Sequence, residues 1–425
     1  MITTAYEITP IRHALDATVH VPGSKSLTNR ALLLASLASG ETRLTNALFS
    51  DDSLYCARAL QALGFDIGLD AARREMTIAG RGGTIPAQEA EVFIGNAGTA
   101  ERFLTAFLTL GNGTYVLDGN TRMRERPIGD LVSALAQLGA RIETTHGCPP
   151  VRIYASGLVG GRATLGGDIS SQFLSALLMV APCAKQPVEI ELATRLNSRP
   201  YVDLTLAVMH EFGVEVERNG YQSFLVQPAR YQHRESYTIE SDASAASYFF
   251  AAPAICGGTV RVNDITRLSA QGDLAFLDIL RQMGCALKEG PDYIEVTGSN
   301  SLRGVDADLR DSPDTAQTLA MIAPFASTPT HIRGIASARL KETDRVHATC
   351  TELSRLGVRV EERADGMTIY PCAAMQPVSI RTYDDHRMAM AFSLIALRIP
   401  GIVIENPECV SKTFPRYFET LESLR

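Results

Sequence analysis

The sequence lacks several patterns that mark common protein classes. No apolar run is long and uninterrupted enough to cross a bilayer, since serines break the runs that follow Arg30 and Phe173. The first residues have neither the basic start and apolar centre of a signal peptide nor the arginine and serine content of a transit peptide. We therefore expect a cytoplasmic protein with no membrane partner.

Paired cysteines and a basic excess are also missing. The eight cysteines are scattered, with no C-x-x-C pair and no histidine at ligand spacing, so neither a zinc site nor a disulfide framework is indicated. We expect reduced thiols and no metal. A net charge of −7 excludes a general nucleic-acid binder. It does not exclude small anions, which are held by local groups of Arg and Lys.

The chain of 425 residues, long enough for two or three domains, contains a sixfold repeat. Small or polar residues open an apolar helix each time, at a spacing near 72 residues. The six copies begin at Ser24, Asn96, Asp168, Asp242, Asp314 and Asp385. Each predicts a strand, a buried helix, a strand, an amphipathic helix and further strands. This pattern predicts an α/β fold built from six similar units.

A second helix in five of the copies ends in an apolar residue followed by glycine. These glycines are Gly64, Gly139, Gly213, Gly284 and Gly357. Each is expected in the left-handed conformation that closes a helix. Pro127 and Pro200 are expected in the first turns of their helices, where proline is tolerated. Ile128, Leu131, Leu135 and Leu138 trace one apolar face in the second copy.

The stretch VPGSKSLTNR resembles a phosphate-binding loop only superficially, because Ser24 separates Gly23 from Lys25 and no earlier glycine is in place. Helix N-termini nevertheless favour anions, and cations recur beside several of them. They include Lys25, Arg30, Arg102, Arg126, Arg345, Arg387 and Lys412. For any single copy, a plain helix cap or a solvated surface cation is the competing interpretation.

Two carboxyl groups, those of Asp314 and Glu342, lie among these cations in the sequence. Asp314 could simply be a helix cap, and Glu342 a surface ion partner of Lys341. In a site that binds phosphates, however, two carboxyl groups are suited to proton transfer rather than to anion binding. The sequence leaves both interpretations open.

Seven segments carry a resemblance to a known family. In chain order they are GSKSLTNRALLLASLA, GNAGTAERFL, RMRERPIGDL, GDISSQFLSALLM, LKETDR, YDDHRMAMAFSLIA and SKTFPRYF. From Val21 to Phe418 the chain resembles the 5-enolpyruvylshikimate-3-phosphate synthases, carboxyvinyl transferases of the shikimate pathway. The resemblance implies a two-domain, inside-out α/β barrel, in which each domain contains three βαβαββ repeats. It implies domains at 23–240 and at 1–22 with 241–425, with the active site in the cleft between them.

The implied reaction joins phosphoenolpyruvate to the 5-hydroxyl of shikimate 3-phosphate through a tetrahedral adduct and releases phosphate without metal or organic cofactor. By resemblance, the shikimate 3-phosphate ligands are Lys25, Ser26, Arg30, Ser170, Ser171, Gln172, Ser198, Tyr201, Asp314, Ser337 and Lys341. The phosphoenolpyruvate ligands are Lys25, Asn96, Gly98, Arg126, Gln172, Arg345, Arg387 and Lys412. Asp314 is the implied base and Glu342 the implied acid, with Lys25 and Lys412 beside them. We expect a monomer.

The chain departs from the family pattern in two places. Ser337 stands where many relatives have asparagine, and Glu101 and Phe103 replace residues that are commonly Met and Pro. Gly98 is retained, which in this family is associated with sensitivity to glyphosate. Two alternatives stay open: transfer of the same group to UDP-N-acetylglucosamine, and a phosphate-binding relative without catalysis. The first usually has a Lys-Asn pair where this chain has Lys25 and Ser26.

Overall fold

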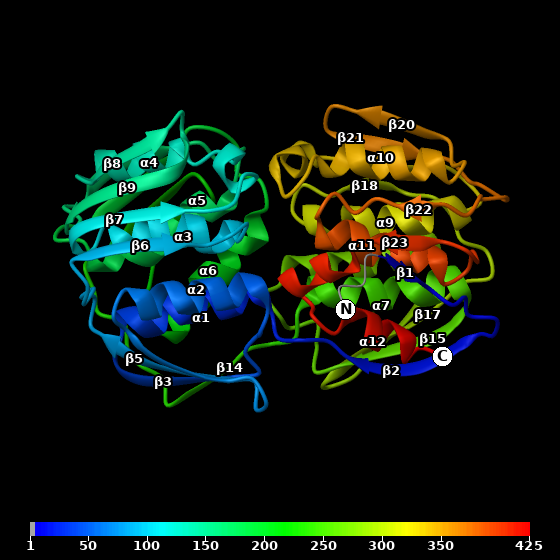
Figure 1. The fold of residues 1–425 in the computed structure, drawn as a ribbon, viewed down its shortest axis with the longest axis horizontal. Coiled ribbons are helices and arrows are strands. Elements are labelled where there is room, and N and C mark those ends of the chain that lie inside the picture. Colours follow the sequence, from blue (N-terminus) through cyan, green and yellow to red (C-terminus); the bar gives the residue numbers. More distant parts are fainter. Residues whose placement is uncertain (1–4) are drawn as a thin grey trace. The chain divides into compact units, whose positions relative to one another are not determined.

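The computed structural model describes residues 5–425, which divide into two compact units. Unit 1 combines the chain up to Pro22 with Glu240–Arg425, and unit 2 is Gly23–Ile239. Figure 1 labels the helices and strands of both units. Each unit has its own hydrophobic core. No helix in the described part of the chain is long and apolar enough to span a membrane.

The second repeat gives the pattern that the others follow. Its strands β6 (Glu89–Phe93), β7 (Asn112–Asp118), β8 (Arg141–Thr145) and β9 (Cys148–Ser156) form a sheet in the order β6-β7-β9-β8. The β6–β7 pair is parallel and the other two pairs are antiparallel. The helices α3 (Gly98–Leu108) and α4 (Gly129–Gln137) follow β6 and β7. The predicted βαβαββ repeat and α/β class are confirmed.

Unit 2 contains two further repeats. The first comprises α1 (Lys25–Leu37), β3 (Ser39–Thr45), α2 (Asp51–Ala62), β4 (Asp66–Asp70) and β5 (Glu75–Arg81). The third comprises β10 (Gly161–Leu165), α5 (Ser171–Val180), β11 (Val188–Leu192), α6 (Arg199–Glu211), β12 (Glu217–Asn219) and β13 (Ser223–Val226). The sheet of the first repeat takes its parallel edge strand from β14 (Ser236–Thr238), at the far end of the unit.

Unit 1 contains the other three repeats. The fourth has α7 (Ala243–Cys256), β15 (Gly258–Asn263), α8 (Phe276–Met283), β16 (Ala286–Glu289) and β17 (Tyr293–Thr297). The fifth has β18 (Asp306–Asp308), α9 (Ala316–Ile322), β19 (Thr330–Arg333), α10 (Arg345–Arg355), β20 (Val360–Arg363) and β21 (Gly366–Ile369). The sixth has β22 (Ser379–Ile380), α11 (His386–Ala396), β23 (Val403–Glu405) and α12 (Tyr417–Glu422).

Two strands from the start of the chain complete sheets of unit 1. Strand β2 (Leu15–His20) pairs in parallel with β15, and β1 (Ala5–Glu7) pairs antiparallel with β23. The sixth sheet consequently has three strands in the order β1-β23-β22, whereas the other five have four. The chain therefore starts in unit 1, passes through unit 2 and returns.

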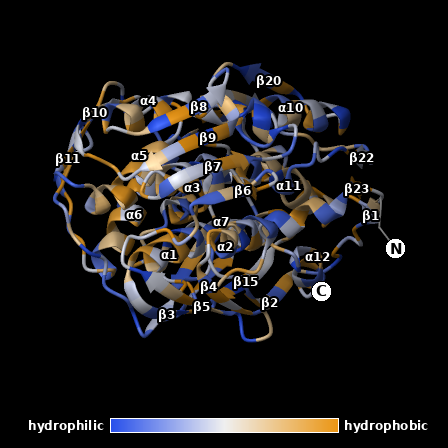
Figure 2. Ribbon diagram, turned by 60° about the vertical axis from the view of Figure 1, so that its left-hand side comes forward, coloured by the Kyte–Doolittle hydropathy of each residue, from blue (hydrophilic) through white to orange (hydrophobic). Residues whose placement is uncertain are grey.

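The first helix of each repeat lies inside its unit. In unit 2, α3 contacts both α1 and α5. In unit 1, α7, α9 and α11 all contact one another. In β15 and β17, for example, buried apolar residues alternate with less buried ones, and both strands contact the inner helix α7. Figure 2 shows mixed hydropathy along the labelled strands. Each unit therefore contains the N-termini of three buried helices.

The five predicted helix-closing glycines all have positive φ, from 81° at Gly213 to 108° at Gly284. The apolar face predicted for the second copy is also confirmed, since Ile128, Leu131, Leu135 and Leu138 are fully buried. Pro200 lies in the first turn of α6 as expected. The prediction for Pro127 is wrong, because α4 starts at Gly129. The carbonyl of Pro127 instead accepts a hydrogen bond from Arg102 at 3.2 Å.

Candidate active site

Arg345 is the centre of an ionic cluster in unit 1. Arg345 is the first residue of α10. Its guanidinium donates to Asp385 at 2.8 Å, to Glu342 at 2.8 Å and to Asp314 at 3.2 Å. Burial lowers the pKa of Arg345, but the three carboxylates outweigh burial and hold that pKa above its usual value. The cluster therefore contains a permanent cation surrounded by three acids.

Asp314 is held by two guanidinium groups rather than acting as a helix cap. It lies in a short 3₁₀ turn, Pro313–Thr315, which leads into α9. One of its oxygens contacts Arg345, and the other accepts a 2.7 Å hydrogen bond from Arg387 of α11. The capping interpretation of this residue is wrong, since Ser312 and Thr315 occupy the N-cap positions of this turn and of α9. Asp314 is thus held in one orientation by two guanidinium groups.

Glu342 contacts two cations and is nearly buried. Its Oε2 accepts from Arg345, and its Oε1 lies 3.7 Å from Nζ of Lys412, which comes from a 3₁₀ helix at Pro407–Lys412. At 7% side-chain exposure, Glu342 is not the surface ion partner considered from the sequence. The structure therefore brings together Asp314, Glu342, Arg345, Arg387 and Lys412, all of them predicted site residues.

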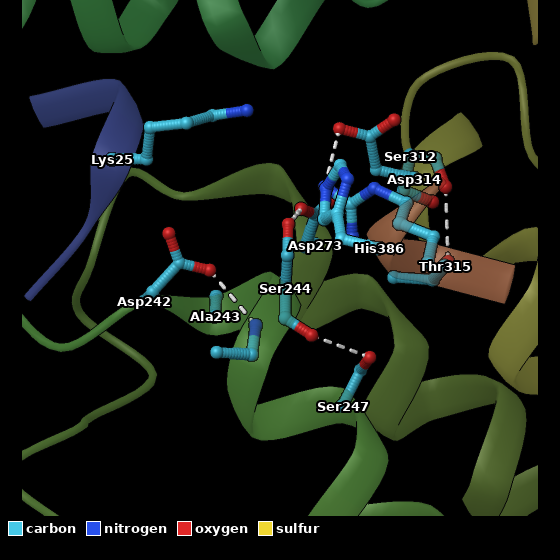
Figure 3. Close-up of polar contacts among 12 residues, drawn as sticks. Lys25, Asp242, Ala243, Ser244, Ser247, Asp273, Ser312, Asp314, Thr315 and His386 are labelled. Atoms are coloured by element: carbon cyan, nitrogen blue, oxygen red, sulfur yellow. Dashed lines mark hydrogen bonds and ion pairs between the residues drawn. The ribbon is translucent and has the colours of Figure 1, made fainter. Parts of the chain in front are cut away.

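Two further acids belong to this region and were missed. Asp385 is fully buried, caps α11 and binds Arg345 through both of its oxygens. Asp273 is also buried, and its carboxylate accepts a hydrogen bond from Ser244 of α7 (Figure 3). Burial and the negative charge of Asp314 raise the pKa of Asp273 to about 6. Asp385 could have been found from its place beside Arg387, whereas Asp273 has no sequence signal of this kind.

Unit 2 carries a separate cluster at the start of α3. Nη1 of Arg126 donates to the carbonyl of Asn96 at 3.2 Å and to its side-chain Oδ1 at 3.0 Å. The guanidinium lies so close to Gly98 that a Cβ there would be 2.3 Å from Nη2 of Arg126. Nε of Arg126 is buried and has no hydrogen-bond partner in the described chain. Three predicted residues, Asn96, Gly98 and Arg126, are therefore in mutual contact.

Arg30 holds helices of unit 2 together. It is 1% exposed, and it donates to Thr205 Oγ1 at 2.8 Å, to the Ser26 carbonyl at 2.9 Å and to the Tyr201 carbonyl at 3.1 Å. It also lies over the ring of Phe103, 5.1 Å from the centroid. Burial lowers the pKa of Arg30 to about 10. Through these bonds Arg30 fixes the Ser26 backbone relative to α6.

The remaining predicted residues of unit 2 lie at helix starts. Lys25 Nζ is 3.2 Å from the buried carboxylate of Asp52, the second residue of α2. Ser170 caps α5, Ser171 begins it, and the Gln172 side chain donates to Thr99 Oγ1 at 3.1 Å. Ser198 precedes α6 with a left-handed backbone, at φ 56° and ψ 43°. In unit 1, Ser337 lies within the 3₁₀ turn Ala336–Leu340 and Lys341 directly follows it.

The arrangement is suited to anion chemistry with proton transfer. Acids held by arginines can exchange protons with a bound reactant, while the cations bind phosphate or carboxylate. Among residues 5–425, no group of three or more His, Cys, Asp or Glu side chains is arranged to hold a metal ion. All eight cysteines are free thiols, as predicted.

Comparisons with known proteins agree with this chemistry. The family described as EPSP synthase (3-phosphoshikimate 1-carboxyvinyltransferase) matches residues 10–421. The 3-phosphoshikimate 1-carboxyvinyltransferase of Trichormus variabilis is 51% identical over 97% of both chains, and that of a Sulfurovum species is 50% identical over 98% of both. Among solved structures, an EPSP synthase from Acinetobacter baumannii matches with a TM-score of 0.83 and 27% identity, over 99% of this chain and 98% of the other.

Proposed function

The chain belongs to the EPSP synthase family, and from this premise we propose that the two clusters, one in each unit, act on a single pair of substrates. The activity is transfer of the enolpyruvyl group of phosphoenolpyruvate to shikimate 3-phosphate, a step of aromatic amino acid biosynthesis. Transfer to UDP-N-acetylglucosamine is not favoured, because the relatives at 50–51% identity carry the 3-phosphoshikimate name. The contact network that joins Asp314 and Glu342 to three cations supports catalysis over anion binding alone.

We assign phosphoenolpyruvate to the predicted cations of the two clusters. Arg126 is supported by its geometry, because Nη1 is anchored on Asn96 while Nε has no partner in the described chain. Arg345, Arg387 and Lys412 supply the positive charge in unit 1. A bidentate guanidinium contact fits phosphate and carboxylate groups alike, and phosphoenolpyruvate has both. Lys25, Gly98 and Gln172 complete this proposed set.

Shikimate 3-phosphate is assigned to polar groups at the helix starts. Hydroxyls and backbone N–H groups there are suited to a sugar-like ring and its phosphate. The proposed ligands are Lys25, Ser26, Ser170, Ser171, Gln172, Ser198, Tyr201, Asp314, Ser337 and Lys341. Arg30 belongs to this set mainly as a support, since its donors already hold Ser26 and Tyr201.

Proton transfer is assigned to the two acids held by arginines. Addition to phosphoenolpyruvate needs a proton delivered to the methylene carbon and another removed from the attacking hydroxyl. Asp314, held by two guanidiniums, is suited to be the base. Glu342, which contacts Arg345 and Lys412, is assigned the role of the acid that delivers a proton to the methylene carbon. Lys25 and Lys412 stabilise the departing phosphate by their charge.

Phosphate release by the purified protein tests this function. With a chelator present, we expect release from phosphoenolpyruvate and shikimate 3-phosphate, and none when UDP-N-acetylglucosamine replaces the acceptor. Circular dichroism would establish that the protein is folded. Absence of release with both acceptors from folded protein would contradict the proposal and favour a phosphate-binding role without catalysis.

The close approach at Gly98 gives a second test. In Gly98→Ala the new methyl would overlap the Arg126 guanidinium and force it away from Asn96. Loss of one charge-assisted contact of about 1.5–3 kcal/mol should raise KM for phosphoenolpyruvate by roughly 10- to 100-fold, with KM for shikimate 3-phosphate little changed. Gly129→Ala is the matched control, because the nearest atom to its Cβ is 3.6 Å away. Equal effects on both substrates would contradict the assignment of Arg126. The same displacement would lower sensitivity to glyphosate if that inhibitor occupies the phosphoenolpyruvate site.

We further propose that the protein is a cytoplasmic monomer. Each unit completes its own hydrophobic core, so neither needs a second copy of the chain to bury its apolar residues. Sedimentation equilibrium at micromolar concentration would test the monomer, since a mass near twice 46.0 kDa would contradict it.

A further inference from the structure

Glu101 is a buried acid whose carboxylate has few polar contacts. It lies in the first turn of α3 and is 0% exposed. Its Oε2 approaches Nη1 of Arg102 to 3.1 Å, yet neither carboxylate oxygen has a hydrogen-bond partner in the described chain. The Arg102 nitrogen that it faces instead donates to the carbonyl of Gly98 at 3.0 Å. Burying an ionised carboxylate in this way is unfavourable.

Arg102 connects Glu101 to Arg126. One nitrogen of Arg102 donates to the carbonyl of Gly98 and the other to the carbonyl of Pro127, which directly follows Arg126. Arg126 in turn contacts Gly98 and Asn96. Glu101 is therefore the negative member of a group with two buried guanidiniums, one of which is a proposed ligand of phosphoenolpyruvate.

We propose that Glu101 is a charge-tuning residue whose protonation is coupled to anion binding at Arg126, so that phosphoenolpyruvate binds together with uptake of a proton. The inference rests on the proposed role of Arg126. A proton on Glu101 removes a negative charge that offsets Arg102 and Arg126. Conversely, an arriving anion makes that proton easier to hold, because coupling between two sites is reciprocal.

The charges that face Glu101 set the pH range. Burial raises the pKa of Glu101 to about 7, against the opposing influence of Arg102 on its own helix and of Arg126 from the loop before α4. From β9, Cys148 faces the same group, and its own pKa is raised by burial and then by Glu101. Glu101 is thus mainly neutral below about pH 7 and mainly charged above it.

The sign of the effect follows from this protonation. Below about pH 7 the guanidiniums act with their full charge and bind an anion well, whereas above it the carboxylate weakens that attraction. Folding also favours the neutral form, because the pKa is higher in the folded state than in the unfolded chain. Stability contributed by neutral Glu101 is therefore present at low pH and lost as the pH rises through about 7.

The isosteric variant Glu101→Gln isolates this charge. KM for phosphoenolpyruvate should be measured at saturating shikimate 3-phosphate from about pH 5.5 to 8.5. At the alkaline end we expect the variant to have a KM roughly fivefold below that of the unchanged protein, a modest coupling between the two sites. At the acid end we expect the two proteins to have equal KM values. The phosphate of the substrate titrates near pH 6, but this effect cancels in the ratio of the two proteins.

Glu143→Gln is the matched control, because it removes an exposed carboxylate from β8 of the same unit. It should leave the KM ratio flat with pH. A Glu101→Gln variant whose KM is raised equally at every pH would overturn the proposal, since Glu101 would then have a packing role only. A ratio that stays at one across the range would overturn it as well.

A calorimetric arm separates this inference from the proposed function. Inorganic phosphate is titrated into each protein in two buffers of different ionisation enthalpy, which reports proton uptake without turnover. Near pH 7, a proton uptake that is greater in the unchanged protein than in Glu101→Gln supports the inference, even if no enzyme activity is found, because the proton exchange of phosphate itself is common to both proteins. Equal uptake in both proteins would contradict it, even if the enzyme is active.

Discussion

Asp314→Asn is expected to lower kcat by roughly 10²- to 10⁴-fold, the range over which a positioned general base contributes. Asparagine keeps the shape of the side chain and one oxygen, but it cannot accept the hydroxyl proton of the acceptor. The contacts to Arg345 at 3.2 Å and Arg387 at 2.7 Å hold the carboxylate in one orientation, so water is a poor substitute. Single-turnover phosphate release would measure the loss.

The pH profile distinguishes a base from an anchor. If Asp314 removes a proton, the acid limb of the kcat profile disappears in Asp314→Asn together with the rate. A fall of less than tenfold with the acid limb intact would mean that Asp314 only holds the two guanidiniums. Asp306→Asn is the control, because that acid is exposed in the same unit and pairs with Arg333. Its activity should be unchanged.

Arg345→Met is expected to cause the largest loss of stability, about 3–5 kcal/mol in the free energy of unfolding. Methionine fills much of the volume but leaves Asp314, Glu342 and Asp385 without the guanidinium that all three share. The three acids then repel one another, with only Arg387 and Lys412 left to balance part of their charge. The deficit should therefore shrink as the pH falls, because protonation removes the uncompensated charges.

Urea denaturation at about pH 5 and about pH 8 would measure this deficit. Arg333→Met is the matched control, since Arg333 also pairs with two acids, Asp306 and Asp308, but its side chain is 53% exposed. Exposed ion pairs contribute about 0–1 kcal/mol, so the control should lose little. A loss of unfolding free energy in Arg345→Met that does not change with pH would indicate lost packing rather than uncompensated negative charge.

Much of the fold could be predicted because it repeats. The periodic helix starts and the five closing glycines recur locally, so six copies reinforce one interpretation. The pairing of strands that lie far apart in the chain could not be predicted in this way. Pairing of β14 with β3, and of β2 with β15, joins segments that are distant in the chain and carry no common motif. Pro127 was misplaced because α4 begins two residues later, at Gly129, and the carbonyl of Pro127 is bound by Arg102 from another helix.

The candidate site was predicted unevenly for a similar reason. Asp314 and Glu342 stand out in the sequence as acids among cations, and the structure does bring them to Arg345. Glu101 and Asp273 owe their properties to burial, which no short stretch of sequence reports. Arg30 looked like a surface cation or a ligand, yet it donates to four groups of its own unit. The roles assigned to individual ligands remain predictions that the experiments above test.

The pairing of β2 with β15 has a consequence for synthesis on the ribosome. Leu15 and Val19 of β2 are buried against unit 1, yet their partners Gly258 and Val262 are made roughly 240 residues later, about 12–50 s at common translation rates. During that time the whole of unit 2 emerges and can fold. Strand β2 meanwhile remains unpaired, with its apolar side chains exposed to solvent. Slower translation of the segment that follows unit 2 would prolong this exposure, so a nascent chain stalled before Gly258 should be captured by chaperones through its first twenty residues.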